Sequence, residues 1–410
     1  NIFYKMLKKI SENYNIYFII MSATLPDLNK YNEEEIANDL IKDYPEYFNH
    51  IVFKRNEFIF ENSKFDERSL LEYLKEKILV SHAQKNKFLI VVNTINSSVE
   101  LFNSFRMESS PLSQYKIFLL NSFVEDKSRL KIIDFIKKSN EKIILISTQS
   151  IEAGVDLDFD IGFRDNAILD SIEQVAGRIN RECKKENSKL YVMNFKNDAN
   201  KIYKKDLRYN LDFKSNEKLA ILNTKKFVDY YDKYFNKIKE YLEGALEVDY
   251  FKEIGEFNFD KIQKLNLIEN RPSIDLFPSE IIKENLDEES LKFINKKNCK
   301  TILDLVKLLE NKNGFEYKPL FNLISKIKSL NSLNLDFFNE FDLQKFISFL
   351  NSNGYVLQEG KLNDYSFILN KTFFDKYILN YGYENNNFSY LNYPQLKEDL
   401  KLSNEESFFA

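Results

Sequence analysis

The chain has 410 residues with 43% apolar and 15% aromatic side chains, so it has room for two or three globular domains and differs from a disordered acidic chain. Its formal net charge of −4 argues against a protein coated with basic surface, although a single basic groove is compatible with that total. Only two cysteines and two histidines are present, which excludes a disulfide framework, a cysteine zinc site and a histidine-rich metal centre within these residues.

The cysteine usage fits a reducing, cytoplasmic location. No apolar run approaches the roughly 18 residues that a membrane-spanning helix needs. No signal peptide is visible either, so we expect neither membrane insertion nor secretion.

The N-terminal part predicts a helix and then a very apolar strand. Residues 2–10 place apolar side chains on one helical face, and the first residue is Asn1 rather than Met, so we expect the chain to begin inside a longer protein. Residues 16–21 form a continuous apolar run, which predicts a strand buried on both faces of a parallel sheet. Ser22, Ala23 and Thr24 follow it and could bond across a cleft to another lobe, although three small residues after a strand are weak evidence alone.

A regular alternation of helices and strands comes next. Residues 32–43 predict a helix, and residues 51–53 and 58–60 predict short strands. From residue 67 onward the pattern predicts helix 67–84, strand 88–92, helix 98–107, strand 116–120, helix 125–138 and strand 142–147. Such alternation produces an α/β fold, in which a parallel sheet carries helices on both faces.

Polar residues follow three of these strands directly: Asn93 and Thr94, Asn121 and Ser122, and Thr148 and Gln149. Ligands of parallel sheets bind at the carboxyl ends of the strands. Hydroxyl, amide and backbone N–H groups at such ends can hold the phosphates of a nucleic acid, which makes these six residues candidates for a nucleic-acid interface. The same residue types are ordinary in loops, so the first two pairs alone leave both interpretations open.

An acidic loop follows the last of these strands. Gly154 lets the chain turn sharply, so that the Thr148 hydroxyl and the Asp156 carboxylate can face one cleft. Asp156 would suit a ribose hydroxyl or an arginine of a partner lobe. Asp158 and Asp160 could suggest a metal site, but they alternate with apolar residues as solvent-facing positions of a strand do. We therefore expect no metal here.

A predicted helix, with Ser171 as its N-cap, carries Gln174, Arg178 and Arg181 at positions i, i+4 and i+7. These side chains would share one helical face, on which Gly177 allows a close approach. Two crowded guanidinium groups are costly unless an anion neutralises them, and a triphosphate is the natural anion. An arginine presented to a γ-phosphate stabilises the transition state of phosphoryl transfer. A surface helix with two solvated arginines is the alternative.

The α/β pattern ends after a strand at 189–193. Residues 219–246 predict one long amphipathic helix, since their apolar side chains recur near helical spacing. Farther along, the pattern predicts short strands at 274–277, 355–358 and 367–369 and helices at 301–309 and 319–330. This last part contains no repeat and no group of residues that indicates chemistry.

The central stretch resembles superfamily 2 helicases, and among them the helicase portion of the type I CRISPR-associated helicase-nuclease family. The resemblance rests on STQSIEAGVDLDFD at 147–160, GFRD at 162–165, LDS at 169–171 and QVAGRINR at 174–181. The segment NSF at 121–123, with Arg129 in the next helix, and MSATLP at 21–26 add to it. It covers residues 16–195 and is weak beyond them.

The resemblance implies roles for the candidate residues. Ser22, Ala23 and Thr24 would couple ATP hydrolysis to movement, and the polar strand ends from Asn93 to Gln149 would contact the DNA backbone. Gln174, Arg178 and Arg181 would meet the triphosphate of ATP across a cleft. Gly154, Asp156 and Gly177 would lie around the nucleotide, with Asp156 linking nucleotide to DNA. Val175 departs from the family, which commonly has arginine at this position.

The resemblance also implies a division of the chain and missing parts. We expect the end of a first RecA-like lobe at 1–30, a linker at 31–50, the second RecA-like lobe at 51–197, a helical linker at 198–255 and an accessory α+β domain at 256–410. The sequence has no GxxxxGK[ST] phosphate loop, no DExH-type acidic segment and no HD-type metal site. We therefore expect the lobe that binds ATP and Mg²⁺, and any nuclease domain, to lie outside these residues. The 410 residues alone should be inactive.

For the intact protein the resemblance implies ATP-driven translocation on single-stranded DNA. It also implies degradation of foreign DNA marked by an RNA-guided CRISPR surveillance complex, by a monomer without a membrane partner. Two alternatives stay open. One is a different superfamily 2 motor, such as an RNA helicase or a restriction-type translocase, and the other is a non-catalytic nucleic-acid-binding module.

Overall fold

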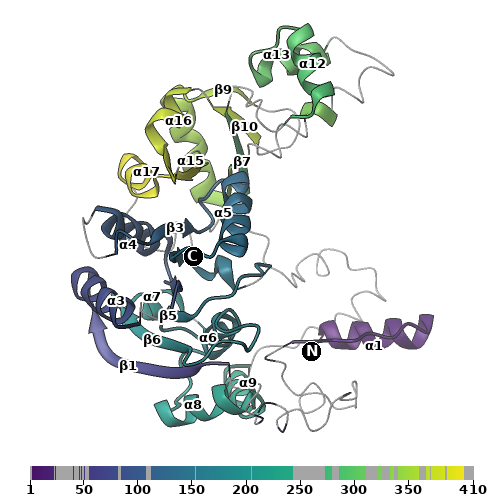
Figure 1. Cartoon of the computed structure of the whole chain (residues 1–410). Coiled ribbons are helices and arrows are strands. Elements are labelled where there is room, and N and C mark those ends of the chain that lie inside the picture. The colour runs from purple at the N-terminus through teal and green to yellow at the C-terminus, as the bar shows by residue number, and fades with distance from the viewer. Residues whose placement is uncertain are drawn as a thin grey trace. The chain divides into compact units, whose positions relative to one another are not determined.

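The computed structural model describes residues 2–22, 24, 40, 46, 48, 50, 55–81, 85–107, 112–152, 154–204, 206–242, 273–278, 286–310, 322–324, 333–336, 340–359, 366–369, 371–383 and 386–400 (Figure 1). The chain divides into two compact units. Unit 1 consists of Asn1–Leu70 and Asp158–Asn270, and unit 2 consists of Leu71–Leu157 and Arg271–Ala410.

Parallel strands form the centre of each unit. Unit 1 contains β1 (Glu57–Phe65), β6 (Lys189–Phe195) and β5 (Ile161–Asp165), and unit 2 contains β2 (Lys87–Val91), β4 (Ile143–Ser147) and β3 (Lys116–Leu120). The strands belong to a six-stranded sheet of order β1-β6-β5-β2-β4-β3. Within each unit the neighbouring strands pair in parallel.

Most strands of the sheet are buried on both faces, and the edge strand β1 is partly exposed. Every residue of β4 and β5 is buried, and in β2 and β3 only the first residue is not. Because successive side chains of a strand point to opposite faces, such runs require cover on both sides. The α/β fold with a parallel sheet that the sequence predicts is confirmed.

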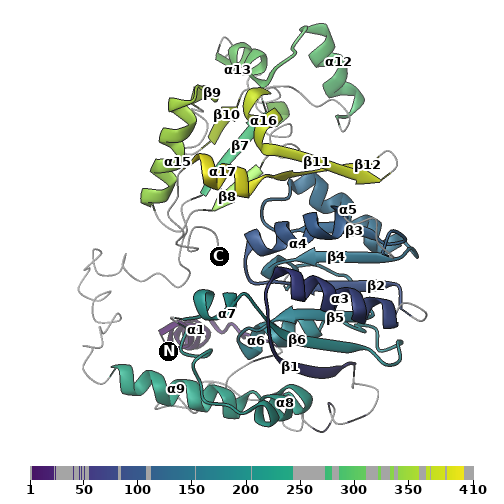
Figure 2. The same ribbon diagram turned by 90° about the vertical axis from the view of Figure 1, so that its left-hand side faces the viewer.

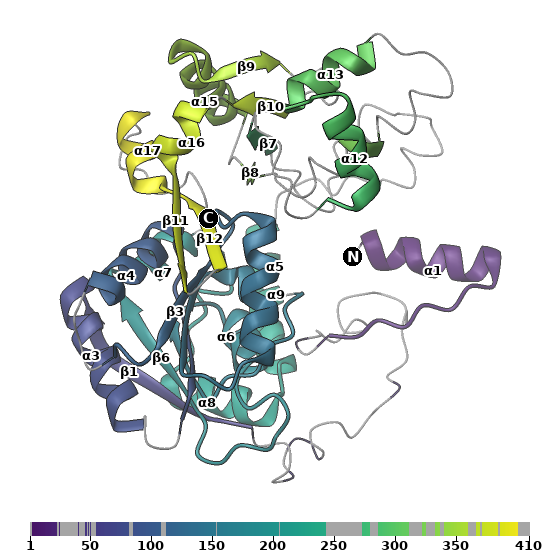
Figure 3. The same ribbon diagram turned by 45° about the horizontal axis from the view of Figure 1, so that its top comes forward.

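Helices supply this cover. They are α3 (Glu67–Ser81), α4 (Ile95–Met107), α5 (Asp126–Lys138), α6 (Leu169–Ala176) and α7 (Asp198–Ile202). In unit 2, α4 and α5 lie on opposite sides of β3 (Figure 1; Figure 3). In unit 1, α6 packs on β5 and α7 packs on β6.

The predicted long helix at 219–246 is wrong, because two helices replace it. They are α8 (Ser215–Thr224) and α9 (Val228–Leu242). Lys225 ends α8 in the left-handed conformation, with φ 59°, which a helix cannot continue through. The Lys225 ammonium pairs with Glu173 at 2.6 Å and Phe227 is buried, so packing within unit 1 favours the break.

The N-terminal helix α1 (Ile2–Tyr14) is present, but the buried strand predicted at 16–21 is not. Residues 16–21 have no strand assignment, and Tyr17 and Met21 are 84% and 87% exposed. No strand among the described residues pairs with this segment, so its apolar side chains remain in solvent. The predicted helix at 32–43 (except Leu40), the predicted strand at 51–53 and the candidate residue Ala23 lie outside the described residues.

The C-terminal part of unit 2 adds small sheets. A four-stranded sheet has the order β8-β7-β10-β9, and a hairpin pairs β11 with β12. The elements are β7 (Ser273–Pro278), α12 (Glu288–Lys296), α13 (Ile302–Glu310), β8 (Leu333–Asp336), α15 (Glu340–Ser352), β9 (Val356–Glu359), β10 (Ser366–Leu369), α16 (Lys371–Tyr377), β11 (Ile378–Tyr383), β12 (Asn386–Leu391) and α17 (Tyr393–Asp399). The strands predicted at 274–277, 355–358 and 367–369 and the helix at 301–309 are therefore confirmed to within one or two residues. Of the helix predicted at 319–330 only residues 322–324 are described, and they are helical.

The β11–β12 hairpin lies beside β3 and α5 within unit 2 (Figure 2; Figure 3). The backbone N–H of Glu125 donates to Ser389 at 3.1 Å, and that of Leu391 donates to Phe123 at 3.0 Å. Aromatic rings pack across the contact, for example Phe118 and Phe388 with centroids 5.5 Å apart. No helix in the described part of the chain is long and apolar enough to cross a membrane.

Candidate functional site

The carboxyl ends of β2, β3 and β4 come together at one edge of unit 2. The parallel register places Val91 and Leu120 opposite Ser147, so the three strands end at the same level. The residues that follow them, Asn93, Asn121 and Thr148, are all buried. The first residue of each predicted polar pair therefore lies at this edge of the sheet. Asn121 and Thr148 follow their strands directly, whereas Val92 lies between the end of β2 and Asn93.

Asn121 joins two of these ends. Its amide nitrogen donates to Ser98 Oγ at 2.9 Å in the first turns of α4, and its amide oxygen accepts from the Phe123 N–H at 2.9 Å. Thr94 caps α4, because its hydroxyl accepts from the Ser97 N–H at 3.0 Å. This cap explains why α4 begins at Ile95, three residues before its predicted start. Asn121 thus holds the loop after β3 against the helix that follows β2.

Thr148 is the N-cap of a short 3-10 helix, η2 (Gln149–Ile151). The Ser147 and Ser150 hydroxyls both donate to the Leu120 carbonyl, and Arg129 of α5 donates to the Ser150 carbonyl at 3.0 Å. The loop after β4 is therefore tied to the end of β3 and to α5. Among the six candidate residues for a nucleic-acid interface, Ser122 is exposed and Thr94 and Gln149 are half-buried.

The acidic loop turns at Gly154, whose φ of +71° a residue with a side chain rarely adopts. The sharp turn predicted there is confirmed. Asp156 pairs with Lys137 of α5 at 2.8 Å, and both side chains are exposed, at 64% and 58%. An exposed pair of this kind contributes at most about 1 kcal/mol, so Asp156 can exchange Lys137 for another partner at little cost.

The shared helical face predicted for Gln174, Arg178 and Arg181 is wrong, because α6 ends at Ala176 and Gly177 is its C-cap. The N–H groups of Arg178 and Ile179 bond three residues back, at 2.9 and 3.0 Å, in a tightened last turn. A Cβ at Gly177 would lie 3.2 Å from the Gln174 carbonyl oxygen, so the tight turn favours glycine at this position. We call residues 177–185 the arginine turn.

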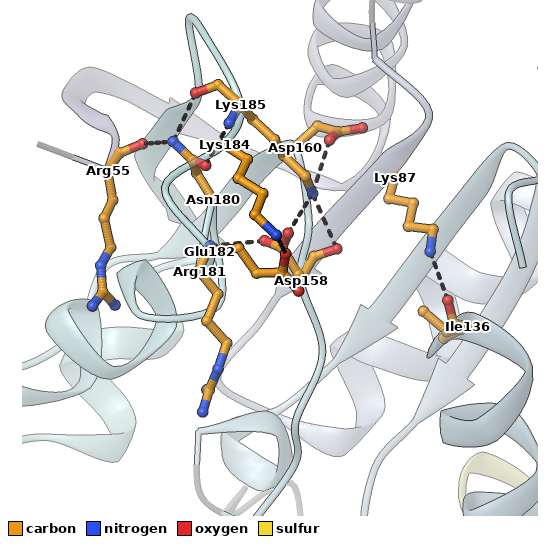
Figure 4. Close-up of polar contacts among 10 residues, drawn as sticks. All are labelled: Arg55, Lys87, Ile136, Asp158, Asp160, Asn180, Arg181, Glu182, Lys184 and Lys185. Carbon is orange, nitrogen blue, oxygen red and sulfur yellow. Dashed lines mark hydrogen bonds and ion pairs between the residues drawn. The ribbon is translucent and has the colours of Figure 1, made fainter. Parts of the chain in front are cut away.

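An isolated bridge to Phe159, in the segment that precedes β5, fixes the arginine turn. The Phe159 N–H donates to the Arg178 carbonyl and the Asn180 N–H donates to the Phe159 carbonyl, both at 2.9 Å. Asn180 itself is buried, with a left-handed φ of 48°. Its amide donates to the Arg55 carbonyl at 2.7 Å, as Figure 4 shows. The two arginines are thus placed by tertiary hydrogen bonds and not by helical geometry.

The turn and the helix before it present one amide and two guanidinium side chains. Gln174 and Arg181 are exposed and Arg178 is half-buried. The Arg181 side chain leads away from the hydrogen-bonded backbone, in the same direction as that of Arg55 (Figure 4). Guanidinium groups in such positions can donate in parallel to phosphate oxygens. Sequence reasoning missed Arg55, because it precedes β1 by two residues and lies 126 positions from Arg181, outside any motif.

Thr24, the predicted coupling residue, joins a polar network inside unit 1. It is buried, its N–H donates to Ser22 Oγ at 3.2 Å, and its hydroxyl is within hydrogen-bonding reach of Tyr231 of α9. Tyr231 donates to Asp170 of α6, and Arg208 Nη1 lies 3.7 Å from the other Asp170 oxygen. Burial and the hydrogen bond to Asp170 raise the pKa of Tyr231, which keeps its proton on the hydroxyl.

Local sequence patterns do not indicate this network. Asp170 belongs to the LDS segment, but Tyr231 reads only as an apolar position of an amphipathic helix, and Arg208 belongs to no motif. The network connects Thr24 with the helix that leads into the arginine turn. Such a contact between segments far apart in sequence cannot be found from local periodicity.

The GFRD and LDS segments form part of the core of unit 1. Arg164 is fully buried, and its Nη2 donates to Ser171 Oγ at 2.7 Å. The prediction that Ser171 is the N-cap of α6 is therefore wrong, because Ile168 occupies that position. Asp165 accepts from the Phe195 N–H at 3.0 Å, and burial raises the pKa of its carboxyl to about 7. These charged residues hold β5, α6 and β6 together.

Comparison with known proteins points to one family. Residues 84–184 match the family model described as the C-terminal part of the CRISPR-associated nuclease/helicase Cas3. This match includes the polar strand ends, the acidic loop and most of the arginine turn.

Named relatives agree with the family model. A CRISPR-associated nuclease/helicase Cas3 of Methanothermobacter thermautotrophicus is 29% identical over 171 residues, which are 40% of this chain and 20% of that protein. A putative Cas3 of Methanocaldococcus jannaschii is 26% identical over 186 residues, or 44% of this chain and 25% of that protein. The matched part of the chain thus spans a quarter or less of these relatives. The crystal structure of T. fusca Cas3-AMPPNP aligns with 82% of this chain and 41% of its own, at 12% identity and a TM-score of 0.45.

Proposed function

We propose that the chain supplies the second motor lobe and accessory region of an ATP-dependent helicase that translocates on single-stranded DNA, because residues 84–184 match the C-terminal model of CRISPR-associated nuclease/helicases. The observation that carries this proposal is the content of the matched segment. It combines polar strand ends at one edge of unit 2 with a turn that presents two arginines from unit 1.

The strand ends are the proposed DNA interface. Ser122, Thr94 and Gln149 retain solvent exposure and can donate to phosphates, whereas buried Asn93, Asn121 and Thr148 shape the loops that carry them. Contacts of this kind follow the backbone and carry no sequence information. Binding to single strands should therefore weaken steeply with salt.

Gln174, Arg178 and Arg181 are the proposed contacts of this chain with the triphosphate of ATP. Mg²⁺ and most of the nucleotide would be held by a lobe outside these residues, and ATP hydrolysis supplies the free energy for movement. Arg181, exposed at the end of a fixed backbone, would stabilise charge that develops on the phosphoryl group. Asp156 would exchange Lys137 for the nucleotide or a partner arginine when the lobes close.

Coupling would run through the Thr24 network. Ser22 and Thr24 follow the apolar segment 16–21 in the chain. Thr24 is connected to α6 through hydrogen bonds of Tyr231 and Asp170. A displacement of Thr24 would then be felt at the start of the helix that leads into the arginine turn. In the intact protein we propose that this cycle serves type I CRISPR interference, with an RNA-guided surveillance complex as partner and with nuclease activity outside these residues.

The test replaces Arg181 with alanine in the intact protein. We expect DNA-stimulated ATP hydrolysis to fall by roughly a thousandfold or more, while the affinity for single-stranded DNA changes little. Thr148→Ala is the companion variant, and it should weaken single-strand binding through its loop. Unchanged ATP turnover of the Arg181→Ala protein would refute the motor assignment, and unchanged DNA affinity of Thr148→Ala would remove that loop from the interface.

A further inference from the structure

The last residue of the arginine turn, Lys185, lies between two aspartates. Lys185 Nζ is 3.0 Å from a carboxylate oxygen of Asp158 and 3.0 Å from one of Asp160. It also donates to the Asp158 backbone carbonyl at 3.3 Å. The three side chains are 24%, 24% and 14% exposed, so the group is largely shielded from solvent. We call Asp158, Asp160 and Lys185 the lysine cluster.

The expectation that Asp158 and Asp160 face solvent on a strand is therefore wrong. Both precede β5, and both turn their carboxylates to one ammonium group (Figure 4). Their alternation with apolar residues reflects the burial of Phe159 and Leu157, and it carries no information about what their own side chains contact.

The lysine cluster is bonded to the backbone of Arg181. The other oxygen of Asp158 accepts from the Arg181 N–H at 2.8 Å. The Lys185 N–H donates to Asn180 Oδ1 at 2.8 Å, and the Asn180 amide donates to the Lys185 carbonyl at 2.7 Å. The loop from Asn180 to Lys185 is thus closed at its base, and Asp158 holds it at Arg181.

The neighbouring lysine has a different environment. Lys184 pairs with Glu182 at 2.7 Å, and the two side chains are 77% and 60% exposed. Both residues of this pair belong to the loop, and the pKa of Lys184 is raised mainly by Glu182, with a smaller electrostatic effect of Asp158. An exposed ion pair of this kind contributes little, whereas loss of the ammonium between two shielded carboxylates leaves like charges facing each other. Lys184 is therefore a matched control for Lys185.

We propose that the lysine cluster positions Arg181 for its contact with the anion. Lys185 neutralises the carboxylates of Asp158 and Asp160. Asp158 can then accept the hydrogen bond from the Arg181 N–H, and this bond fixes the backbone position from which the Arg181 side chain extends. Lys185 acts through Arg181 and is a positioning residue. The role in catalysis rests on the proposed function, but the mechanical part of the inference, that Lys185 keeps the turn closed, does not.

The mechanical part is tested on this chain with Cys183 as an internal probe. Cys183 is half-buried in the loop, and its N–H donates to the Asn180 carbonyl at 3.0 Å, whereas Cys299 is buried. In Lys185→Met the rate at which a disulfide reagent modifies Cys183 should rise roughly tenfold, because the loop opens more often. Lys185→Arg keeps the charge and should restore the slow rate. Lys184→Met removes one charge beside the same thiol and should leave the rate within about twofold.

Equal Cys183 rates in Lys185→Met and Lys184→Met would overturn the inference. Asp160→Asn is the second variant, for the case that Lys185→Met does not fold. It removes one charge of the lysine cluster and leaves the bond from Arg181 to Asp158 in place, so it should raise the rate less than Lys185→Met. A rate equal to that of the unmodified sequence in Asp160→Asn would also count against the cluster.

The catalytic part is tested in the intact protein. Lys185→Met should lower kcat for ATP roughly ten- to a hundredfold with little change in KM, since a displaced arginine is missed mainly in the transition state. In an Arg181→Ala background the same change should have no further effect. If the two substitutions instead lower kcat independently, so that their effects multiply in the double variant, Lys185 does not act by positioning Arg181. If Arg181→Ala itself leaves turnover unchanged, the proposed function fails, and the Cys183 rates still decide whether the cluster holds the turn.

Discussion

The Tyr381 side chain of β11 bonds the backbone of the edge strand β3, in the place where a neighbouring strand would otherwise pair. In a parallel strand, alternate residues point their N–H and C=O groups to the two neighbours, and β3 has β4 on one side only. On the open side the Leu119 N–H donates to the Tyr381 hydroxyl at 3.1 Å, which donates back to the Leu119 carbonyl at 3.3 Å. Tyr383 does the same for Ile117, at 2.6 and 3.0 Å.

Replacing Tyr381 with phenylalanine removes both bonds and little else. The ring keeps its edge-on contact with Phe102, whose centroid lies 4.7 Å away. Leu119 is fully buried, so its N–H loses its partner in a place that solvent does not reach. A buried polar group left without a partner costs about 1–3 kcal/mol, so we expect unit 2 to lose about 2 kcal/mol.

Amide hydrogen exchange measures this effect at the bond that is lost. A change of about 2 kcal/mol corresponds to roughly thirtyfold faster exchange at Leu119. Tyr390→Phe is the matched control, because Tyr390 packs on the same Phe102 but its hydroxyl makes only a 3.4 Å bond to Asn103. Equal exchange at Leu119 in the two variants would mean that the hydroxyl of Tyr381 does not satisfy this edge.

Two further changes probe unit 1. Because burial raises the pKa of Asp165 to about 7, against about 4 in an unfolded chain, its contribution to stability is complete below about pH 4 and is lost as the pH rises to 7. Asp165→Asn keeps the acceptor for Phe195 and should remove this loss, of the order of 4 kcal/mol; parallel curves of melting temperature against pH for the two proteins would contradict it. Gly162→Ala would place a Cβ 2.8 Å from Ile179 Cδ1 and from a Leu190 methyl, so it should lower stability by about 1–3 kcal/mol. Adding Ile179→Val should recover part of that loss, and no recovery in thermal unfolding would argue against the clash.

The sequence predicted the sheet well because buried parallel strands leave a strong local signal. The strand at 116–120 agrees at both ends with β3, and β4 begins one residue later than its predicted start. Continuous apolar runs of this length have few other uses in a globular protein. Segment 16–21 has the same apolar pattern, yet its side chains are exposed. An apolar run therefore indicates that a segment is suited to burial, but it does not identify the element that would cover it.

The arginine turn marks the limit of local pattern. The spacing of Gln174, Arg178 and Arg181 fits a helix, and every residue after Ala176 departs from it. The departure depends on Asn180 in a left-handed conformation and on a bridge from Phe159, twenty positions upstream of Ile179. Tertiary hydrogen bonds of this kind override helical periodicity, and the partners lie too far apart for a periodicity window of about 11–18 residues to contain both.

The same dependence on distant partners connects the C-terminal hairpin with the proposed DNA interface. Asn121 and Ser122 end β3, and the next three residues are bonded to β12: Val124 bridges Tyr390, Glu125 donates to Ser389, and Leu391 donates to Phe123. With Tyr381 and Tyr383 on the strand itself, the hairpin contacts β3 along its edge and beyond its end. A movement of the loop at Asn121 must therefore carry the hairpin with it or break several buried hydrogen bonds. If that loop contacts DNA, the hairpin is bonded so that it responds to movement of the loop.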